Sequence, residues 1–221
     1  MRYLKLMGLA FFFLLSSCVS DMNFGEPQPK NDRDERKFKN KFQGKYLCLA
    51  DSSILTIGNK TLIQEWNIKV HLAKSFIDSA EGHDLKDGLL YSKGIETPLP
   101  VDIMGDTVVA TWQHEKEIFN ISEEQVLRHY KGIYFLNYKH ADQEWTVKIM
   151  KTGKDGTLSI KRIYGGDEEI EELQKLTEVE EIADEKGKVV NLKIQPTRKE
   201  LKGILAADLF KEGTIFKKLK E

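Results

Sequence analysis

The chain has few of the residues that cross-link a fold or hold a metal. Cys18 and Cys48 are its only cysteines, so the 221 residues allow one intramolecular disulfide at most. The five histidines are scattered, without the HExxH spacing or the paired cysteines of zinc sites. We therefore expect no metal, no cofactor and a fold held by burial and hydrogen bonds.

Linear motifs of several enzyme classes are also missing. The sequence has no GxSxG elbow, no Walker loop and no GxGxxG glycine fingerprint. Its 34 basic and 35 acidic residues are mixed along the chain, which excludes the basic footprint of a nucleic-acid-binding protein. We name no catalytic residue and do not expect an enzyme, although distant strands can bring catalytic groups together.

The one long apolar run stands at the N-terminus. The chain begins MRYLKLMGLAFFFLLSSC, with Arg2 and Lys5 ahead of an apolar core that ends in two serines. This order is typical of a cleaved signal peptide. The core has roughly ten residues, about half of what a membrane-spanning helix needs. We predict that residues 1–17 are a signal peptide.

The end of this run, Leu15-Ser16-Ser17-Cys18, resembles the lipobox of bacterial lipoproteins. In that family the cysteine becomes the acylated first residue, so the resemblance implies a lipid anchor such as palmitate at Cys18. Two or more acyl chains hold a protein stably on a membrane. Segments such as NISEEQVLRHYKGIYFLN are similar to uncharacterised lipoproteins of Bacteroidota. These resemblances imply the cell envelope, at the outer membrane with its face undecided, and no activity.

After the cysteine the chain is polar and irregular. The segment VSDMNFGEPQPKNDRDERKFKNK contains two prolines and charges of both signs. Such a composition buries too little apolar surface to offset its ordering entropy. We expect residues 18–41 to be a lipidated N-terminus and flexible tether, which would let the domain stand roughly a few nanometres from the membrane.

Residues 42–221 are expected to form a single β-rich domain. The clearest alternation, Trp66-Asn67-Ile68-Lys69-Val70-His71-Leu72, puts its apolar side chains on one face. Turn signals such as Gly58-Asn59, Gly105-Asp106 and Asp155-Gly156 separate the apolar runs. We predict about ten strands, arranged as an antiparallel meander.

Three short helices are predicted among the strands, which makes the fold class mainly β with a few helices (α+β). Ser122 and Gln125 have the spacing of a capping box, for a helix that ends near Tyr130. Asp167 would cap a second helix. Thr197, with Glu200 three residues on, would open a third.

Two segments, residues 42–72 and residues 130–151, echo each other. FQGKYL and YKGIYF each precede a strand that begins Glu-Trp, EWNIKV and EWTVKI. The echo favours two duplicated β halves, unless similar strand edges simply choose similar residues. A lipocalin-like barrel is the other architecture considered. The aromatics that would line its cavity, or else fill a packed core, are Tyr46, Trp66, Trp112 and Trp145.

Two further features have simple structural explanations. Cys48 lies in the apolar run YLCL, which indicates a small buried hydrophobe rather than a reactive thiol. The acidic segment DSAEGHD at residues 78–84 is better explained as a solvated turn than as a cation site, because a glycine interrupts it.

We expect a non-catalytic, lipid-anchored binding module for a small apolar ligand or an envelope partner. The alternative is a structural or assembly lipoprotein that docks another envelope protein through its strand edges and helices. A hydrolase of envelope polymers is a third class, which no residue constellation in the sequence supports.

Overall fold

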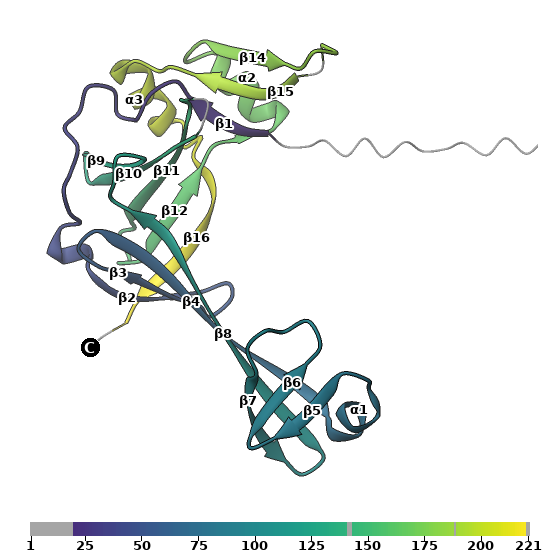
Figure 1. The fold of residues 1–221 in the computed structure, drawn as a ribbon. Coiled ribbons are helices and arrows are strands. Elements are labelled where there is room, and N and C mark those ends of the chain that lie inside the picture. Colours follow the sequence, from purple (N-terminus) through teal and green to yellow (C-terminus); the bar gives the residue numbers. More distant parts are fainter. Residues whose placement is uncertain (1–19, 141–142, 188, 220–221) are drawn as a thin grey trace, which may run out of the picture.

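The computed structural model describes residues 20–140, 143–187 and 189–219, so the predicted signal peptide and Cys18 lie outside the described residues. Within them, 16 strands form one open sheet, accompanied by three short α-helices and one 3-10 turn (Figure 1). The prediction of a mainly β fold with a few short helices is confirmed.

The elements alternate along the chain with short connections. In order they are β1 (Ser20–Phe24), η1 (Asn40–Phe42), β2 (Gly44–Cys48), β3 (Ile54–Ile57), β4 (Thr61–Ala73), α1 (Lys74–Ser79), β5 (His83–Lys86), β6 (Leu89–Ser92), β7 (Leu99–Met104), β8 (Thr107–Asn120), β9 (Gln125–Tyr130), β10 (Ile133–Lys139), β11 (Trp145–Thr152), β12 (Leu158–Arg162), β13 (Tyr164–Gly165), α2 (Asp167–Gln174), β14 (Val179–Ala183), β15 (Val189–Ile194), α3 (Arg198–Ala206) and β16 (Lys211–Lys218).

The sheet follows the order β14-β15-β1-β11-β12-β16-β2-β3-β4-β8-β7-β6-β5, with β9, β10 and β13 attached beside this path. The strand pairs of the described residues are antiparallel except β1 with β15, which run parallel. Because the path has two ends, the sheet does not close. The lipocalin-like barrel is therefore not formed.

The body of the molecule is packed around two apolar clusters. In one, helices α2 and α3 cover β1, β11 and β15, through residues that include Phe24, Trp145, Leu173, Leu201 and Ile204. The other lies among β2, β3, β10, β12 and β16, and includes Phe38, Tyr46, Cys48, Tyr134 and Phe216. Cys48 is buried as a small hydrophobe, as predicted.

Two long strands leave this body and carry a small lobe at their far end (Figure 1). We call residues 66–70 of β4 and 110–114 of β8 the ribbon, and residues 71–109 the distal lobe. The lobe has its own apolar cluster, in which Ile77 of α1 and Leu90 of β6 pack on Val108 and Ala110 of β8. The molecule therefore has a body and a lobe joined by two strands.

The expectation of a flexible tether is wrong for residues 20–41. Strand β1 lies inside the sheet between β15 and β11, and Met22 and Phe24 are buried. Phe38 is fully buried against Phe119 and Tyr134. Composition misled because a few well-spaced apolar side chains bury enough surface when the rest of the chain provides their sites.

Polar contacts also hold this segment on the body. The Asn137 side chain accepts a hydrogen bond from the Gln28 backbone N–H at 2.6 Å and donates one to the Gln28 carbonyl at 3.0 Å. Arg128 donates to the carbonyl oxygens of Pro27 and Pro29 and pairs with Asp34. These contacts satisfy backbone groups that no neighbouring strand pairs.

Two of the three predicted helices form. Helix α2 covers Asp167–Gln174, but the prediction that Asp167 caps it is wrong: Asp167 is its first helical residue, and the N-cap is Gly166, without a side-chain hydrogen bond. Helix α3 begins after Thr197 with both capping-box hydrogen bonds in place. The segment from Ser122 is not helical: Gln125 opens strand β9, which pairs along its whole length with β10. The Ser122 hydroxyl still accepts from the Gln125 backbone N–H, at 3.1 Å, but there it closes a turn.

The two segments that echo each other lie in different settings. Residues 42–72 supply β2, β3 and most of β4, whereas residues 130–151 supply β10 and most of β11. Gly44 and Gly132 both have positive φ just where a strand begins. Trp145 is buried in the body, while Trp66 is only half-buried.

Candidate functional site

The ribbon exposes an apolar face to solvent. Register pairs Trp66 with His114, Ile68 with Trp112 and Val70 with Ala110, so these side chains share one side of the two strands. Farther out, the same face is covered by the distal lobe. Ala110 is still buried in the lobe's cluster, but nearer the body the face is open, and Ile68, Val70 and Trp112 are 40–42% exposed. The predicted alternation in β4 is confirmed, but the apolar side is not an interior.

Three rings on this face form a continuous row. The rings of Trp112 and His114 are stacked, with centroids 5.2 Å apart and planes inclined by 13°. The Trp66 ring, across the strand pair, lies 5.5 Å from His114 at 31°. Stacked rings at such separations are mutually stabilising. The row is therefore a preformed cluster of aromatic rings on the ribbon.

Asp51, in the turn between β2 and β3, holds Trp66 in place. Its carboxylate accepts a hydrogen bond from the Trp66 indole N–H at 2.8 Å, and others from the Ser53 backbone and hydroxyl at 3.0 and 2.6 Å. Desolvation raises the pKa of Asp51, but the hydrogen bonds from Cys48, Ser53 and Trp66 outweigh it and hold the pKa well below its ordinary value. The ionised Asp51 side chain thus fixes the orientation of Trp66 in the aromatic row.

The edges of the ribbon are free. Strand β3 pairs with β4 only as far as Glu65, and β7 pairs with β8 only as far as Ala110. Over residues 66–70 of β4 and 111–114 of β8, the two strands pair only with each other among the described residues. Backbone N–H and C=O groups on such edges can pair with another extended chain.

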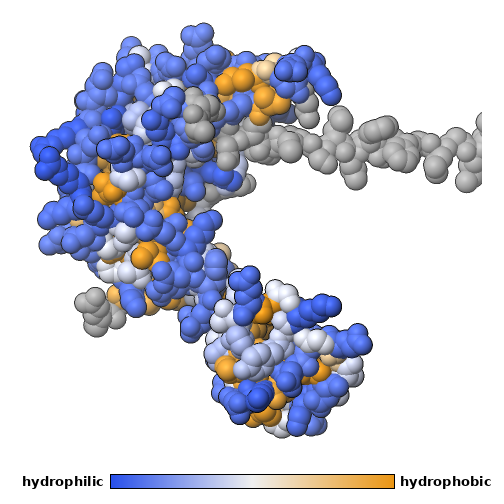
Figure 2. Space-filling view, viewed as in Figure 1, coloured by the Kyte–Doolittle hydropathy of each residue, from blue (hydrophilic) through white to orange (hydrophobic). Residues whose placement is uncertain are grey.

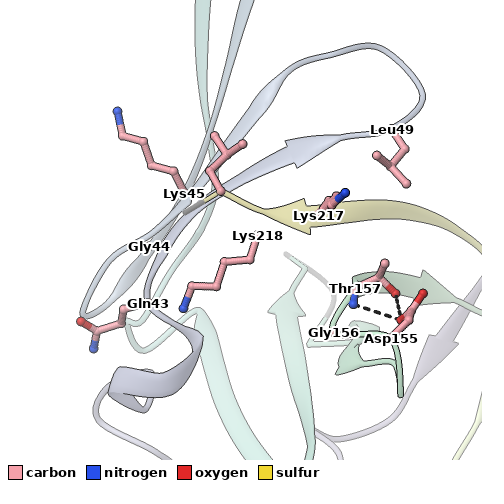
Figure 3. A pocket seen from close by; sticks show the side chains of 10 residues that line it. Gln43, Gly44, Lys45, Leu49, Asp155, Gly156, Thr157, Lys217 and Lys218 are labelled. Atoms are coloured by element: carbon pink, nitrogen blue, oxygen red, sulfur yellow. Dashed lines mark hydrogen bonds between the residues drawn. The ribbon is translucent and has the colours of Figure 1, made fainter. Parts of the chain in front are cut away.

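A groove elsewhere on the body lacks convergent chemistry. It has a volume of about 830 Å³ and lies beside β2, β16 and the β11–β12 turn. Figure 3 shows that the ammonium groups of Lys45, Lys217 and Lys218 point in different directions, while Asp155 is hydrogen-bonded to Thr157. These lysines therefore do not form an anion site.

The predicted site residues have separate fates. Cys18 lies outside the described residues. Asp78 ends up in α1, and His83 and Asp84 in β5; no group of three or more potential metal ligands occurs in the described part of the chain. Of the four aromatics assigned to an interior, Tyr46 and Trp145 are buried, whereas Trp66 and Trp112 lie on the ribbon. An alternating pattern of apolar and polar residues shows which side chains share a face of a strand, but not whether another part of the protein covers that face.

Comparisons with known proteins do not identify the chain: no family model, curated protein or solved structure matches it. Among the described residues, every helix is too short or too polar to span a bilayer. The ribbon's own geometry is therefore the basis for a functional proposal.

Proposed function

We propose that this is a lipid-anchored protein of the bacterial cell envelope whose ribbon binds an extended segment of another envelope protein. The observation that carries the proposal is the exposed row of Trp66, His114 and Trp112 on a ribbon with free edges. The anchor is the acylated Cys18, at the outer membrane, and the role is binding rather than catalysis.

An added strand would use both features of the ribbon. Its backbone would pair with a free edge, and every second side chain would lie beside the aromatic row. Aromatic residues with few rotatable bonds are frequent binding hot spots. Because Asp51 already orders Trp66, binding costs less side-chain entropy there.

A small apolar ligand fits this surface less well. Sites for such ligands are concave and bury most of the molecule. The hollows next to the row, of about 550 Å³ beside Trp112 and about 350 Å³ beside Trp66, are open. The first is lined by both apolar and polar residues, and the second mostly by polar or charged ones. An extended polypeptide needs no enclosed cavity.

Site-specific photo-cross-linking in intact cells tests the ribbon. A photoreactive amino acid at Ile68, on the aromatic face, should give one defined protein adduct whose cross-linked peptide is an extended apolar segment. The same probe at Lys69, exposed on the opposite face, is the matched control. Equal adducts at both positions, or none at either, would contradict the proposal.

A second arm measures the contribution of one ring. Trp112→Ala should weaken binding of a synthetic peptide with the cross-linked sequence about 30-fold, the equivalent of the ~2 kcal/mol of a hot-spot residue. Thr111→Ala, its neighbour on the other face, should leave the affinity unchanged. A titration by fluorescence anisotropy distinguishes the two outcomes.

The anchor has its own test. Cells fed radioactive palmitate should label the wild-type protein and not Cys18→Ser, because only the cysteine can be acylated in this way. If Cys18→Ser takes up as much label as wild type, the lipid anchor is wrong, whatever the ribbon binds.

A further inference from the structure

The first described residue stands very close to the proposed anchor. Strand β1 begins at Ser20, two residues after Cys18. Two residues of fully extended chain span at most about 7 Å. A lipid on Cys18 therefore leaves almost no slack, and the part of the body around the start of β1 must lie at the membrane surface.

The β14–β15 hairpin lies beside that point. Met22 of β1 pairs in parallel with Leu192 of β15, and the same register extended backward brings Val190 level with Ser20. Figure 1 shows the hairpin next to the start of β1. The hairpin is thus the structural neighbour of the anchor.

This hairpin exposes apolar side chains where β15 begins. Val189 and Val190 are 41% and 50% exposed, whereas Leu192 and Ile194, farther along the strand, are buried. A register shift opposite Ile182 and Ala183 adds an extra residue to β15 here. Figure 2 shows apolar surface along the hairpin.

We infer that Val189 and Val190 rest on the lipid surface beside acylated Cys18, so that the hairpin and the anchor together orient the body on the membrane. The inference depends on the lipid anchor of the proposed function. Acidic residues of the neighbouring helix α2, Asp167, Glu168 and Glu169, favour a zwitterionic surface over an anionic one. The distal lobe lies at the far end of the molecule from β1, which points the ribbon away from the membrane (Figure 1).

The test places an environment-sensitive fluorescent amino acid at Val190 of the full, lipidated protein. The protein is reconstituted into phosphatidylethanolamine–phosphatidylcholine vesicles, with and without bromine on the acyl chains. We expect a blue shift on reconstitution and a loss of emission with brominated lipid. The same probe at Met104, 67% exposed in the distal lobe, should show neither change.

Flotation of the vesicles separates the two ideas. If the protein floats with the vesicles but the probe at Val190 is not quenched, the resting hairpin is wrong and the anchor stands. If wild type does not float, the anchor fails. A blue shift of the Val190 probe without vesicles, at concentrations where the protein dimerises, would assign the valines to a second copy and overturn the inference.

Charge substitutions supply a second readout. In the wild type, bound vesicles should shield the hairpin from an added protease. The double variant Val189→Asp, Val190→Asp should still float with the vesicles, but its hairpin should be cleaved. Ile103→Asp with Met104→Asp, at more exposed apolar positions in the distal lobe, should leave that protection unchanged. Protection that persists in the Val189–Val190 variant would also contradict the inference.

Discussion

Asp51 shows how a single exposed carboxylate orders a surface. It joins the β2–β3 turn to Trp66 on the ribbon, and the hydrogen bonds that it accepts favour its ionised form. No linear motif links Asp51 to Trp66, because the contact depends on how the turn between β2 and β3 lies over β4.

Stability should therefore fall on acidification through Asp51. A folded-state pKa below the unfolded value of about 3.9 means that its contribution is complete above that pH and is lost as the pH falls further. Asp51→Asn should lower the free energy of unfolding at neutral pH by about 1 kcal/mol, the net value of one hydrogen bond. The variant should also lose less stability than wild type as the pH falls. Urea unfolding between pH 3 and 7, followed by tryptophan fluorescence, measures both; Glu123→Gln, in an exposed turn, is the control. If the free energy of unfolding of Asp51→Asn falls with pH as steeply as that of wild type, other carboxylates cause the loss of stability in acid.

Phe38 tests whether residues 20–41 belong to the fold. Its ring is fully buried between Phe119 and Tyr134, so Phe38→Ala should lower the free energy of unfolding by about 3–5 kcal/mol. Arg36→Ala, exposed two residues earlier, should change it by less than about 0.5 kcal/mol. Chemical denaturation measures both variants. If Phe38→Ala changes the free energy of unfolding as little as Arg36→Ala does, residues 20–41 are a flexible tether after all.

At the scale of elements, local signals worked where nothing in the tertiary structure competed with them. The turns at Gly58-Asn59, Gly105-Asp106 and Asp155-Gly156 all connect paired strands, as their residues predicted. The same capping-box spacing gave a helix at Thr197 and a turn at Ser122, because Val126 to Tyr130 find a strand partner in β10. Pairing with the next strand of the chain, in a hairpin, outweighs a local cap.

The two caps should respond differently to truncation. Thr197→Ala removes the acceptor for the Glu200 backbone N–H and should cost about 1 kcal/mol with a loss of helical signal in circular dichroism. Ser122→Ala should leave the helical signal unchanged, because its hydroxyl serves a turn before β9. A loss of helical signal in Ser122→Ala would indicate a helix there in solution.

At the scale of the molecule, the body and the distal lobe have separate apolar clusters joined by two strands. Burial in the body does not depend on residues beyond the ribbon, since no member of its two clusters lies between Trp66 and His114. The ribbon and the distal lobe, together called the arm, are therefore an addition to the body, and its core does not depend on them.

Removing the arm should separate stability from binding. Replacing residues 67–113 by Asn-Gly joins the directly paired Trp66 and His114 with a two-residue hairpin loop. We expect the body to unfold within about 4 °C of wild type, the shift that ~1 kcal/mol produces in a domain of this size. Binding of the cross-linked peptide, measured by the same anisotropy titration, should be lost. A body that fails to fold in calorimetry would show that the arm supports it.

The sequence by itself determined the strand alternation, the hairpin turns, two helix starts and a lipobox-like N-terminus, because each depends on neighbouring residues. Only the tertiary structure decided that β1 lies inside the sheet, that the sheet stays open, and that Trp66 and Trp112 face solvent. Alternation shows which side chains share a face, but what covers that face is set by elements far away in the chain. The ribbon thus became a candidate site only when nothing in the described structure covered it.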